Sequence, residues 1–359
     1  MKRLTPFFFI VMLVLQACGG SAATEAPQPS EAPATESAPA ATEASAAEAT
    51  SEPIVHVTIP TEGLEARATA HDNEVSSSAE DKDVTFGDDF SNNRFERPFT
   101  ANDMTYLPDL DIVDFSISSD DSFFYIRIDL VDVDLASQTL TGFYGVEFDK
   151  NSDGRAEIFL VTHPPYSAEF TADNVYLFID SNGDIGADQA ARSDAANGNG
   201  FDSILFDLSN NIHPEDVDLA WVRFINDGKP AVEIAYKKWL FKDGNENFMW
   251  SVTANDALID PAQYNFHDAL TEADAGSPTK SNPNYPVKLL AAMDNTCRVP
   301  FGFQATGNEP LGCDVSNLAP EPEEAEEIDF CAQFPSACDR LPSPPPIIQF
   351  FDEEFEVLK

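Results

Sequence analysis

The chain has 359 residues, of which 63 are acidic and 20 are Lys or Arg, and its formal net charge at pH 7 is −43. A surface this negative repels nucleic acid and anionic lipid, so we expect no nucleic-acid partner. The charge fits a solvated exported surface or a surface that gathers cations. The length allows one large domain or two small ones once the polar ends are set aside.

The N-terminus has the plan of a secretory signal peptide over residues 1–17. Lys2 and Arg3 precede the apolar stretch Phe7–Leu15, which is shorter than the roughly 20 residues that a membrane-spanning helix needs. The next residues, Leu15-Gln16-Ala17-Cys18, resemble the lipobox of bacterial lipoproteins. The resemblance implies that Cys18 is lipidated and anchors the chain at the cell surface or on a periplasm-facing membrane. The alternative is an ordinary cleaved signal peptide with a coincidental cysteine.

Two polar segments flank the part of the chain that is rich in aromatic and β-branched residues. Residues 18–53 are dominated by Ala, Thr, Ser, Glu and Pro and contain no aromatic side chain. This composition cannot offset its ordering entropy by burial, so it predicts a disordered stalk; a glycosylated, mucin-like stalk is the alternative. Residues 314–359 form an acidic, Pro-rich tail, which we interpret as a loosely attached end. The folded domain is therefore expected over residues 54–313.

Strand patterns are plentiful in this domain. The segment Phe124–Leu130 alternates large apolar side chains with more polar ones, which is the period of a half-buried strand. Similar patterns occur at Gly142–Phe148, Ala156–Val161, Val175–Ile179, Ser203–Leu208, Leu219–Ile225 and Ala231–Tyr236. Short helices are expected only near Pro261–Gln263 and within Tyr285–Met293. Many short strands with few helices predict a mainly β fold, an antiparallel β-sandwich, and no repeat supports a propeller.

Two acidic loops have the spacing of calcium ligands. The first loop places oxygen-bearing side chains at its positions 1, 3, 5 and 9, and the second repeats this spacing with glycine at position 7. Oxygen ligands at alternate positions of a tight loop can converge on one Ca²⁺ ion, and position 7 would contribute its backbone carbonyl. The predicted ligands are Asp149, Asn151, Asp153, Arg155 and Glu157 in the first loop, and Asp180, Asn182, Asp184, Gly186 and Asp188 in the second.

The first loop resembles the D-x-N-x-D-G core of calcium loops. Position 12 is Leu160 rather than Glu, and the flanks read as strands, so a calcium loop between two strands is a better match than an EF-hand. The alternative for both loops is an exposed acidic turn, because Asp, Asn and Gly cluster in such turns. The segment Asn197–Asp202 could complete the second site or form a flexible turn.

Four cysteines follow Cys18, and all of them lie late in the chain. An even number in an exported protein indicates disulfides, and three pairings are open. We favour Cys297–Cys313 and Cys331–Cys338, because each pair closes a short loop. Zinc binding is the competing use, but no histidine lies nearby.

No catalytic motif stands out in the chain. G-x-S-x-G, H-E-x-x-H and P-loop patterns are absent. Paired carboxylates could serve a glycoside hydrolase, but an acid-rich chain always contains such pairs. Trp221, Trp239 and Trp250 could hold sugar rings if exposed, while core packing is the alternative.

Two stretches resemble known proteins. Asp109–Asp149 combines an acidic start, a Ser-Asp-Asp turn and a Phe-Phe-Tyr-Ile-Arg-Ile strand, and it resembles the opening of family 9 carbohydrate-binding and DOMON-type sandwiches. The block Asp294–Cys313 is similar to the ends of uncharacterised exported bacterial proteins, which implies no activity. These features together predict a lipid-anchored, calcium-stabilised module that binds glycan or another surface polymer. A glycan hydrolase and a structural or assembly lipoprotein are the alternatives.

Overall fold

The computed structural model of the protein describes residues 54–183, 185, 200–241, 246–260, 271–314 and 318. The chain divides into two compact units, Met1–Pro53 and Ile54–Lys359, and every described residue belongs to the second unit. Cys18 and the expected stalk lie outside the described residues, as do Cys331, Cys338 and the end of the chain from residue 319. In the described part of the chain, no helix has the length and apolarity to cross a membrane.

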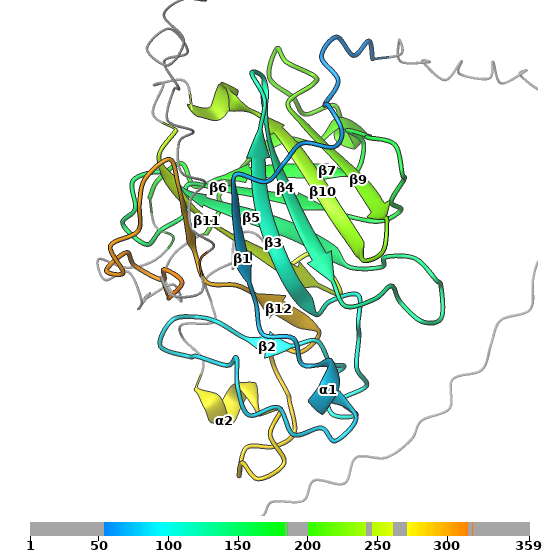
Figure 1. Ribbon diagram of the computed structural model, residues 1–359, viewed down its shortest axis with the longest axis vertical. Coiled ribbons are helices and arrows are strands. Elements are labelled where there is room, and N and C mark those ends of the chain that lie inside the picture. The colour runs from blue at the N-terminus through cyan, green and yellow to red at the C-terminus, as the bar shows by residue number, and fades with distance from the viewer. Residues whose placement is uncertain are drawn as a thin grey trace, which may run out of the picture. The chain divides into compact units, whose positions relative to one another are not determined.

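The first sheet has five antiparallel strands in the order β1-β3-β4-β10-β9 (Figure 1). Its β3–β4 hairpin turns at Asp120, whose carboxylate accepts the N–H groups of Ser122 and Phe123, each at 2.7 Å. The acidic turn residues thus satisfy the backbone donors that the chain reversal leaves free. The strands are β1 (Ala68–His71), β3 (Ile112–Ser119), β4 (Phe123–Leu130), β9 (Ala220–Asn226) and β10 (Pro230–Lys237).

The second sheet is larger and also antiparallel, with the order β2-β12-β11-β5-β6-β7-β8, and β13 pairs with β11 beside β12. Its strands cross behind those of the first sheet in Figure 1, which gives a sandwich-like arrangement. The strands are β2 (Glu96–Arg97), β5 (Phe143–Asp149), β6 (Ile158–Thr162), β7 (Val175–Ile179), β8 (Ser203–Phe206), β11 (Phe248–Asn255), β12 (Met293–Asn295) and β13 (Val299–Phe301).

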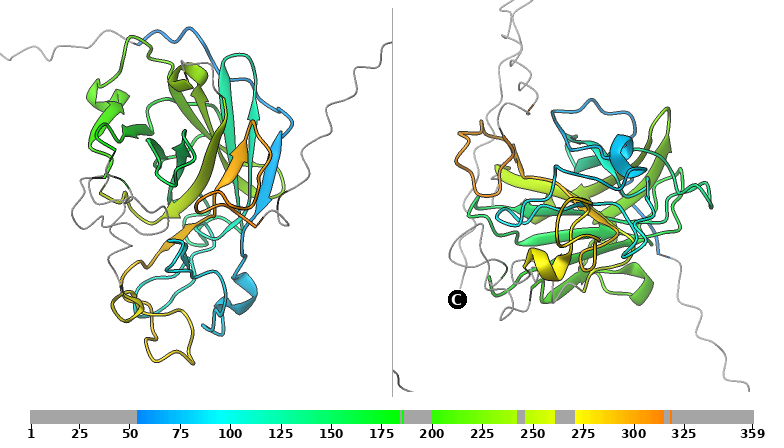
Figure 2. Two further views of the ribbon diagram at one scale, coloured as in Figure 1. Left: turned by 90° about the vertical axis from the view of Figure 1, so that its left-hand side faces the viewer. Right: turned by 90° about the horizontal axis from the view of Figure 1, so that it is seen from below.

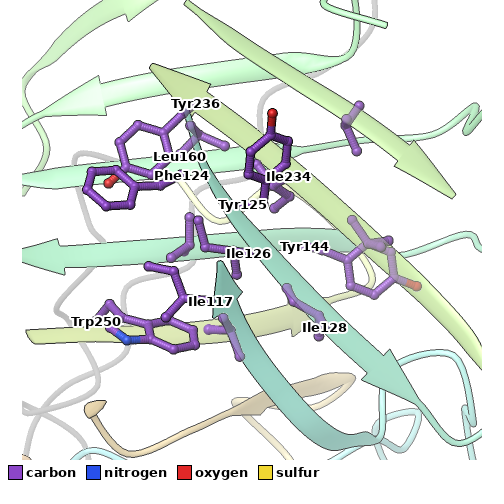
Figure 3. Close-up of a cluster of buried hydrophobic side chains, with 14 of the residues drawn as sticks. Ile117, Phe124, Tyr125, Ile126, Ile128, Tyr144, Leu160, Ile234, Tyr236 and Trp250 are labelled. Atoms are coloured by element: carbon purple, nitrogen blue, oxygen red, sulfur yellow. The ribbon is translucent and has the colours of Figure 1, made fainter. Parts of the chain in front are cut away.

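The main core lies between the two sheets. Phe124 and Ile126 of β4 face Tyr144, Leu160 and Trp250 of the second sheet, and all five side chains are completely buried (Figure 3). Each large apolar side chain that leaves water contributes about 1.5–3 kcal/mol. Burial between the two sheets therefore explains why large apolar side chains recur at every second position of Phe124–Leu130.

The predicted fold class, a mainly β fold with two antiparallel sheets, is confirmed. Each of the seven predicted segments contains a strand, namely β4 to β10 in chain order. The strand β11 was not predicted, although Trp250 to Asn255 alternate apolar and polar residues; every one of its residues is buried. Trp221 and Trp250 are buried, in agreement with the core alternative for these residues.

Helices are short and few among the described residues. They are α1 (Ser76–Ala79), α2 (Glu272–Ala275) and the 3₁₀ turns η2 (Leu208–Asn210) and η3 (Lys238–Phe241). Together with β2, α1 and α2 lie in an irregular lobe below the sheets (Figures 1 and 2). The helix expected within Tyr285–Met293 is wrong: Leu290 and Ala292 have left-handed backbone angles, and β12 begins at Met293. Residues 261–263 lie outside the described residues.

Candidate metal centres

The first predicted loop connects β5 to β6. Asp149 is the last residue of β5, and its carboxylate accepts the N–H of Gly154 at 2.8 Å. Ser152 and Gly154 both have positive φ, at 60° and 90°, which turns the chain back toward β6. The Glu157 carboxylate closes the loop by accepting the N–H of Lys150 at 2.7 Å. The side chains of this loop therefore point inward and hold its backbone.

Three of the predicted ligands converge inside this loop. Asp149, Asp153 and Glu157 each offer one carboxylate oxygen, and these oxygens lie within 4.8 Å of one another. The amide of Asn151 joins the group by donating to Glu157 Oε1 at 3.0 Å. The guanidinium of Arg155 lies 3.3 Å from Asp153 Oδ2, and its Nη1 donates to the Gly183 carbonyl of the second loop at 3.4 Å. The loop thus contains an acidic group that could hold a metal ion.

A buried arginine from elsewhere in the chain shares this group. Arg298 Nη1 lies 3.0 Å from Asp149 Oδ2, and Nη2 lies 3.1 Å from Glu147 Oε2. Arg298 is 5% exposed and Asp149 is 0% exposed, so this is an ion pair inside the protein. Arg298 and Gly154 both use Oδ2 of Asp149. The other oxygen, Oδ1, accepts a long bond of 3.3 Å from the Asp153 N–H and is the better placed of the two for a metal ion.

The electrostatics of the loop oppose its full ionisation. Burial raises the pKa of Asp149, although the charge of Arg298 and the Gly154 N–H act against this. Burial also raises the pKa of Glu157 to about 7, and the negative charges of Asp149 and Asp153 add to the effect. A divalent cation would reverse these repulsions, because it favours all three carboxylates in their charged form.

The second predicted loop lies against the first. The Asp180 N–H donates to the Glu157 carbonyl at 3.0 Å. The antiparallel β6–β7 pairing brings the loop before β6 and the loop after β7 to the same end of the strands. Asp180 accepts the N–H groups of Asn182 and Gly183, at 3.2 and 2.7 Å. Asp184, Gly186 and Asp188 lie outside the described residues, so the convergence of this ligand set stays a prediction.

Asp202, at the end of the expected Asn197–Asp202 segment, also reaches the second loop. Its carboxylate accepts the backbone N–H and the hydroxyl of Ser181, at 3.1 and 2.8 Å. A second acidic side chain, besides Asp180, thus contacts this loop at Ser181.

Cys297 and Cys313 form a disulfide, which is the first of the two favoured pairs. The bond fixes the chain directly beside Arg298, whose backbone N–H donates to the Leu311 carbonyl at 2.9 Å. The arginine that pairs with Asp149 is therefore held in place by a covalent crosslink.

Trp239 is the one tryptophan in the chain that is not buried. It is half-buried and lines a cavity of about 590 Å³ together with Thr58, Asp216, Asp218 and Lys237. Lys237 Nζ lies 2.6 Å from Asp216 Oδ2, so the polar wall of the cavity is held by an ion pair. A volume of this size is typical of small-ligand pockets.

A further acidic group, Asp72, Glu96 and Asp294, was missed by sequence reasoning. Their carboxylate oxygens also lie within 4.8 Å of one another. The three residues come from distant parts of the chain, so no local spacing could have indicated them.

Comparisons of the chain with protein-family models, with curated proteins and with solved structures found no match.

Proposed function

We propose that the protein is a calcium-stabilised β-sandwich binding module that takes an extracellular glycan or a similar polymer. The observation that carries the proposal is the convergence of Asp149, Asp153 and Glu157 inside one hairpin loop. All ligands on offer there are carboxylate or amide oxygens, and no sulfur or imidazole takes part. Hard cations prefer such ligands, and Ca²⁺ accepts the irregular geometry of a loop more readily than Mg²⁺ does.

Calcium would act here as a structural ion. The loop joins β5 to β6 in the middle of the second sheet, and Asp149 pairs in register with Met249 of the central strand β11. A cation that neutralises the loop would remove the repulsion among three carboxylates next to this strand. The expected consequence is a more stable sandwich rather than a catalytic centre.

The cavity beside Trp239 is the proposed ligand site. A half-buried indole can stack on the apolar face of a sugar ring, and Asp216 and Lys237 can bond its hydroxyl groups. The resemblance of Asp109–Asp149 to carbohydrate-binding sandwiches supports the same class of ligand. A lipid on Cys18 and an extended stalk would hold this cavity away from the membrane surface, where a polymer can reach it.

Calorimetric titration of the chelator-treated full chain with Ca²⁺ tests the metal part of the proposal. We expect calcium to bind and to raise the melting temperature, and the double variant Asp153→Asn with Asp180→Asn to reduce both effects. Asp121→Asn is the matched control, because Asp121 lies exposed in another acidic turn. If the double variant takes up calcium and gains stability as the wild type does, both loops are only acidic turns.

A glycan array followed by tryptophan fluorescence tests the ligand part. Binding of a polysaccharide should change the emission of the wild type, and Trp239→Ala should abolish the binding. Release of reducing ends from the bound polysaccharide would instead indicate the hydrolase. A blank array together with co-purification of one defined protein would indicate an assembly role.

A further inference from the structure

The acidic group that sequence reasoning missed lies where both sheets meet the irregular lobe. Asp72 directly follows β1, and Asp111 directly precedes β3, so both lie at the ends of strands of the first sheet. Glu96 lies in β2 and Asp294 in β12, which are neighbours in the second sheet. Ile112 of β3 donates its N–H to Asp294 Oδ2 at 2.7 Å, which joins the two sheets at this point.

Two of these carboxylates are directly opposite each other on paired strands. Glu96 faces Asp294 in the antiparallel β2–β12 register, and they are only 2% and 0% exposed. Like charges at opposed positions destabilise a sheet, and burial removes the water that would screen them. Two ionised carboxylates at this position therefore require a positive partner.

Each of the four side chains also keeps one buried oxygen without a hydrogen-bond partner. Asp294 uses Oδ2 for the Ile112 N–H, and Asp111 uses Oδ2 for the Tyr106 hydroxyl at 2.6 Å. Buried polar atoms are almost always paired, so one unpaired oxygen on each of four neighbouring acids requires an explanation. The unpaired atoms are Asp72 Oδ2, Glu96 Oε1, Asp111 Oδ1 and Asp294 Oδ1.

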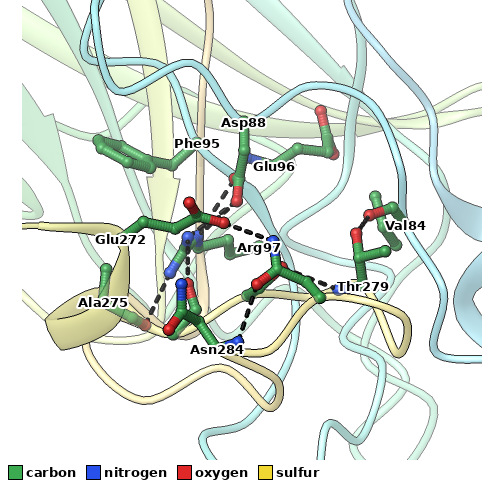
Figure 4. A network of polar contacts seen from close by, with 12 residues as sticks. Val84, Asp88, Phe95, Glu96, Arg97, Glu272, Ala275, Thr279 and Asn284 are labelled. Atoms are coloured by element: carbon green, nitrogen blue, oxygen red, sulfur yellow. Dashed lines mark hydrogen bonds and ion pairs between the residues drawn. The ribbon is translucent and has the colours of Figure 1, made fainter.

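Among the described residues, no Lys or Arg forms an ion pair with any of these four acids. Arg97 follows Glu96 in the chain, but its guanidinium lies 2.8 Å from Asp88 Oδ2 and 2.9 Å from the Ala275 carbonyl. Figure 4 shows the Glu96 carboxylate pointing away from this network. Arg94 is close enough to lower the pKa of Asp72, against the larger effect of burial.

The protonation of the group agrees with a missing positive charge. Burial, followed by the charges of its acidic neighbours, raises the pKa of Glu96 and of Asp294 well above the usual range. Burial also raises the pKa of Asp72 and of Asp111 to about 7. A divalent cation at this position would favour the charged form of all four acids.

We infer that Asp72, Glu96 and Asp294 bind a hard divalent cation, with Asp111 as a fourth carboxylate beside it, and that this ion ties the two sheets together. The ligand set contains only carboxylate oxygens, which suits Ca²⁺ and disfavours Zn²⁺. The ion would replace the partners that the four unpaired oxygens lack. This site is separate from the loops of the proposed function and does not depend on them.

Counting bound calcium in a chain with both loops disabled tests this inference. The full chain carrying Asp153→Asn and Asp180→Asn should still bind one Ca²⁺ in equilibrium dialysis and should still melt higher with calcium than with chelator. Adding Glu96→Gln should weaken this binding at least about tenfold, since even residues behind the ligands of metal sites have effects of that size. Adding Glu80→Gln, the same change at an exposed acid nearby, should leave it unaltered.

Where Glu96→Gln fails to fold, Asp72→Asn takes its place, because Asp72 is the more exposed ligand of the group. If the loop-disabled chain binds no calcium and its melting temperature ignores the ion, the inference is overturned, and Arg94 or shared protons neutralise the group. If calcium binds but Glu96→Gln and Glu80→Gln behave alike, the ion sits elsewhere and the inference is again overturned. If only the proposed calcium loops are wrong, the wild type and the loop-disabled chain will bind the same amount of calcium. In both chains the binding will still require Glu96.

Discussion

Replacing Arg298 with methionine separates the structural ion pair from the candidate calcium loop. The substitution keeps the apolar stem but removes the charge that pairs with Asp149 and Glu147. Asp149 is completely buried, so its carboxylate would be left without a positive partner. Breaking a buried pair from one side costs about 3–5 kcal/mol. At about 2–4 °C per kcal/mol for a domain of this size, the melting temperature should fall by roughly 6 °C or more in chelator.

Calcium should return part of this loss. With the guanidinium gone, Asp149 loses its positive neighbour and the loop is more negative, so calcium should bind more tightly than in the wild type. A tenfold tighter affinity corresponds to about 1.4 kcal/mol of additional stabilisation. The calcium-dependent rise in melting temperature should therefore be larger in Arg298→Met than in the wild type.

Denaturant unfolding of both proteins, each with calcium and with chelator, measures these four free energies. Arg127→Met is the matched control, because its pair with Asp129 is partly exposed and such pairs contribute about 0–1 kcal/mol. An equal calcium increment in wild type and Arg298→Met would refute a calcium ion next to Asp149. A loss below about 1 kcal/mol in chelator would refute the importance of the ion pair itself.

Three further predictions concern other parts of the domain. Trp239→Ala should abolish polysaccharide binding at temperatures where calorimetry shows the domain to be folded, as fluorescence titration would show; some stability is lost too, because Trp239 packs against the main core. The disulfide closes a loop with a sequence separation of 16 residues, so the double variant Cys297→Ala with Cys313→Ala should lose about 3 kcal/mol in denaturant unfolding. Burial opposes the ionisation of Asp218. The backbone N–H groups of Thr58 and Val57 outweigh burial and lower the pKa of Asp218. A depressed pKa stabilises the fold above the unfolded value near 4, and this contribution is lost as the pH falls through the folded value. Melting of Asp218→Asn should consequently depend less on pH than that of wild type between about pH 5 and pH 2.

The strands that bury one face were predicted, and the central strand was not. In β4, Phe124 and Ile128 face the core while Arg127 and Asp129 remain partly exposed, so burial leaves an alternating pattern in the sequence. In β11 even Ser251 and Thr253 are buried, because other parts of the chain cover the outer face of the sheet. The residues Trp250 to Asn255 do alternate, so their period could have indicated a strand. The burial of its polar face could not be predicted, because that burial depends on tertiary packing.

The same difference separates the two acidic groups. The first loop was predictable because Asp149, Asp153 and Glu157 fall within nine consecutive residues, so their convergence depends on one local turn. Glu96 and Asp294 are brought together only by the β2–β12 register, which no local spacing encodes. Arg298 was equally invisible as a partner of Asp149, because the pairing depends on β13 lying beside β11.

The two groups are physically linked through one short segment. Asp294 contributes to the buried group between the sheets, and Arg298, four residues later, pairs with Asp149 in the loop. Both ends of this segment lie along β11: Asp294 pairs with Ala254, and Val299, directly after Arg298, pairs with Trp250. Cys297 anchors the segment between them through its disulfide. A shift of this segment would disturb both groups together, so the block Asp294–Cys313 has a structural reason to be distinctive even though it contains no catalytic motif.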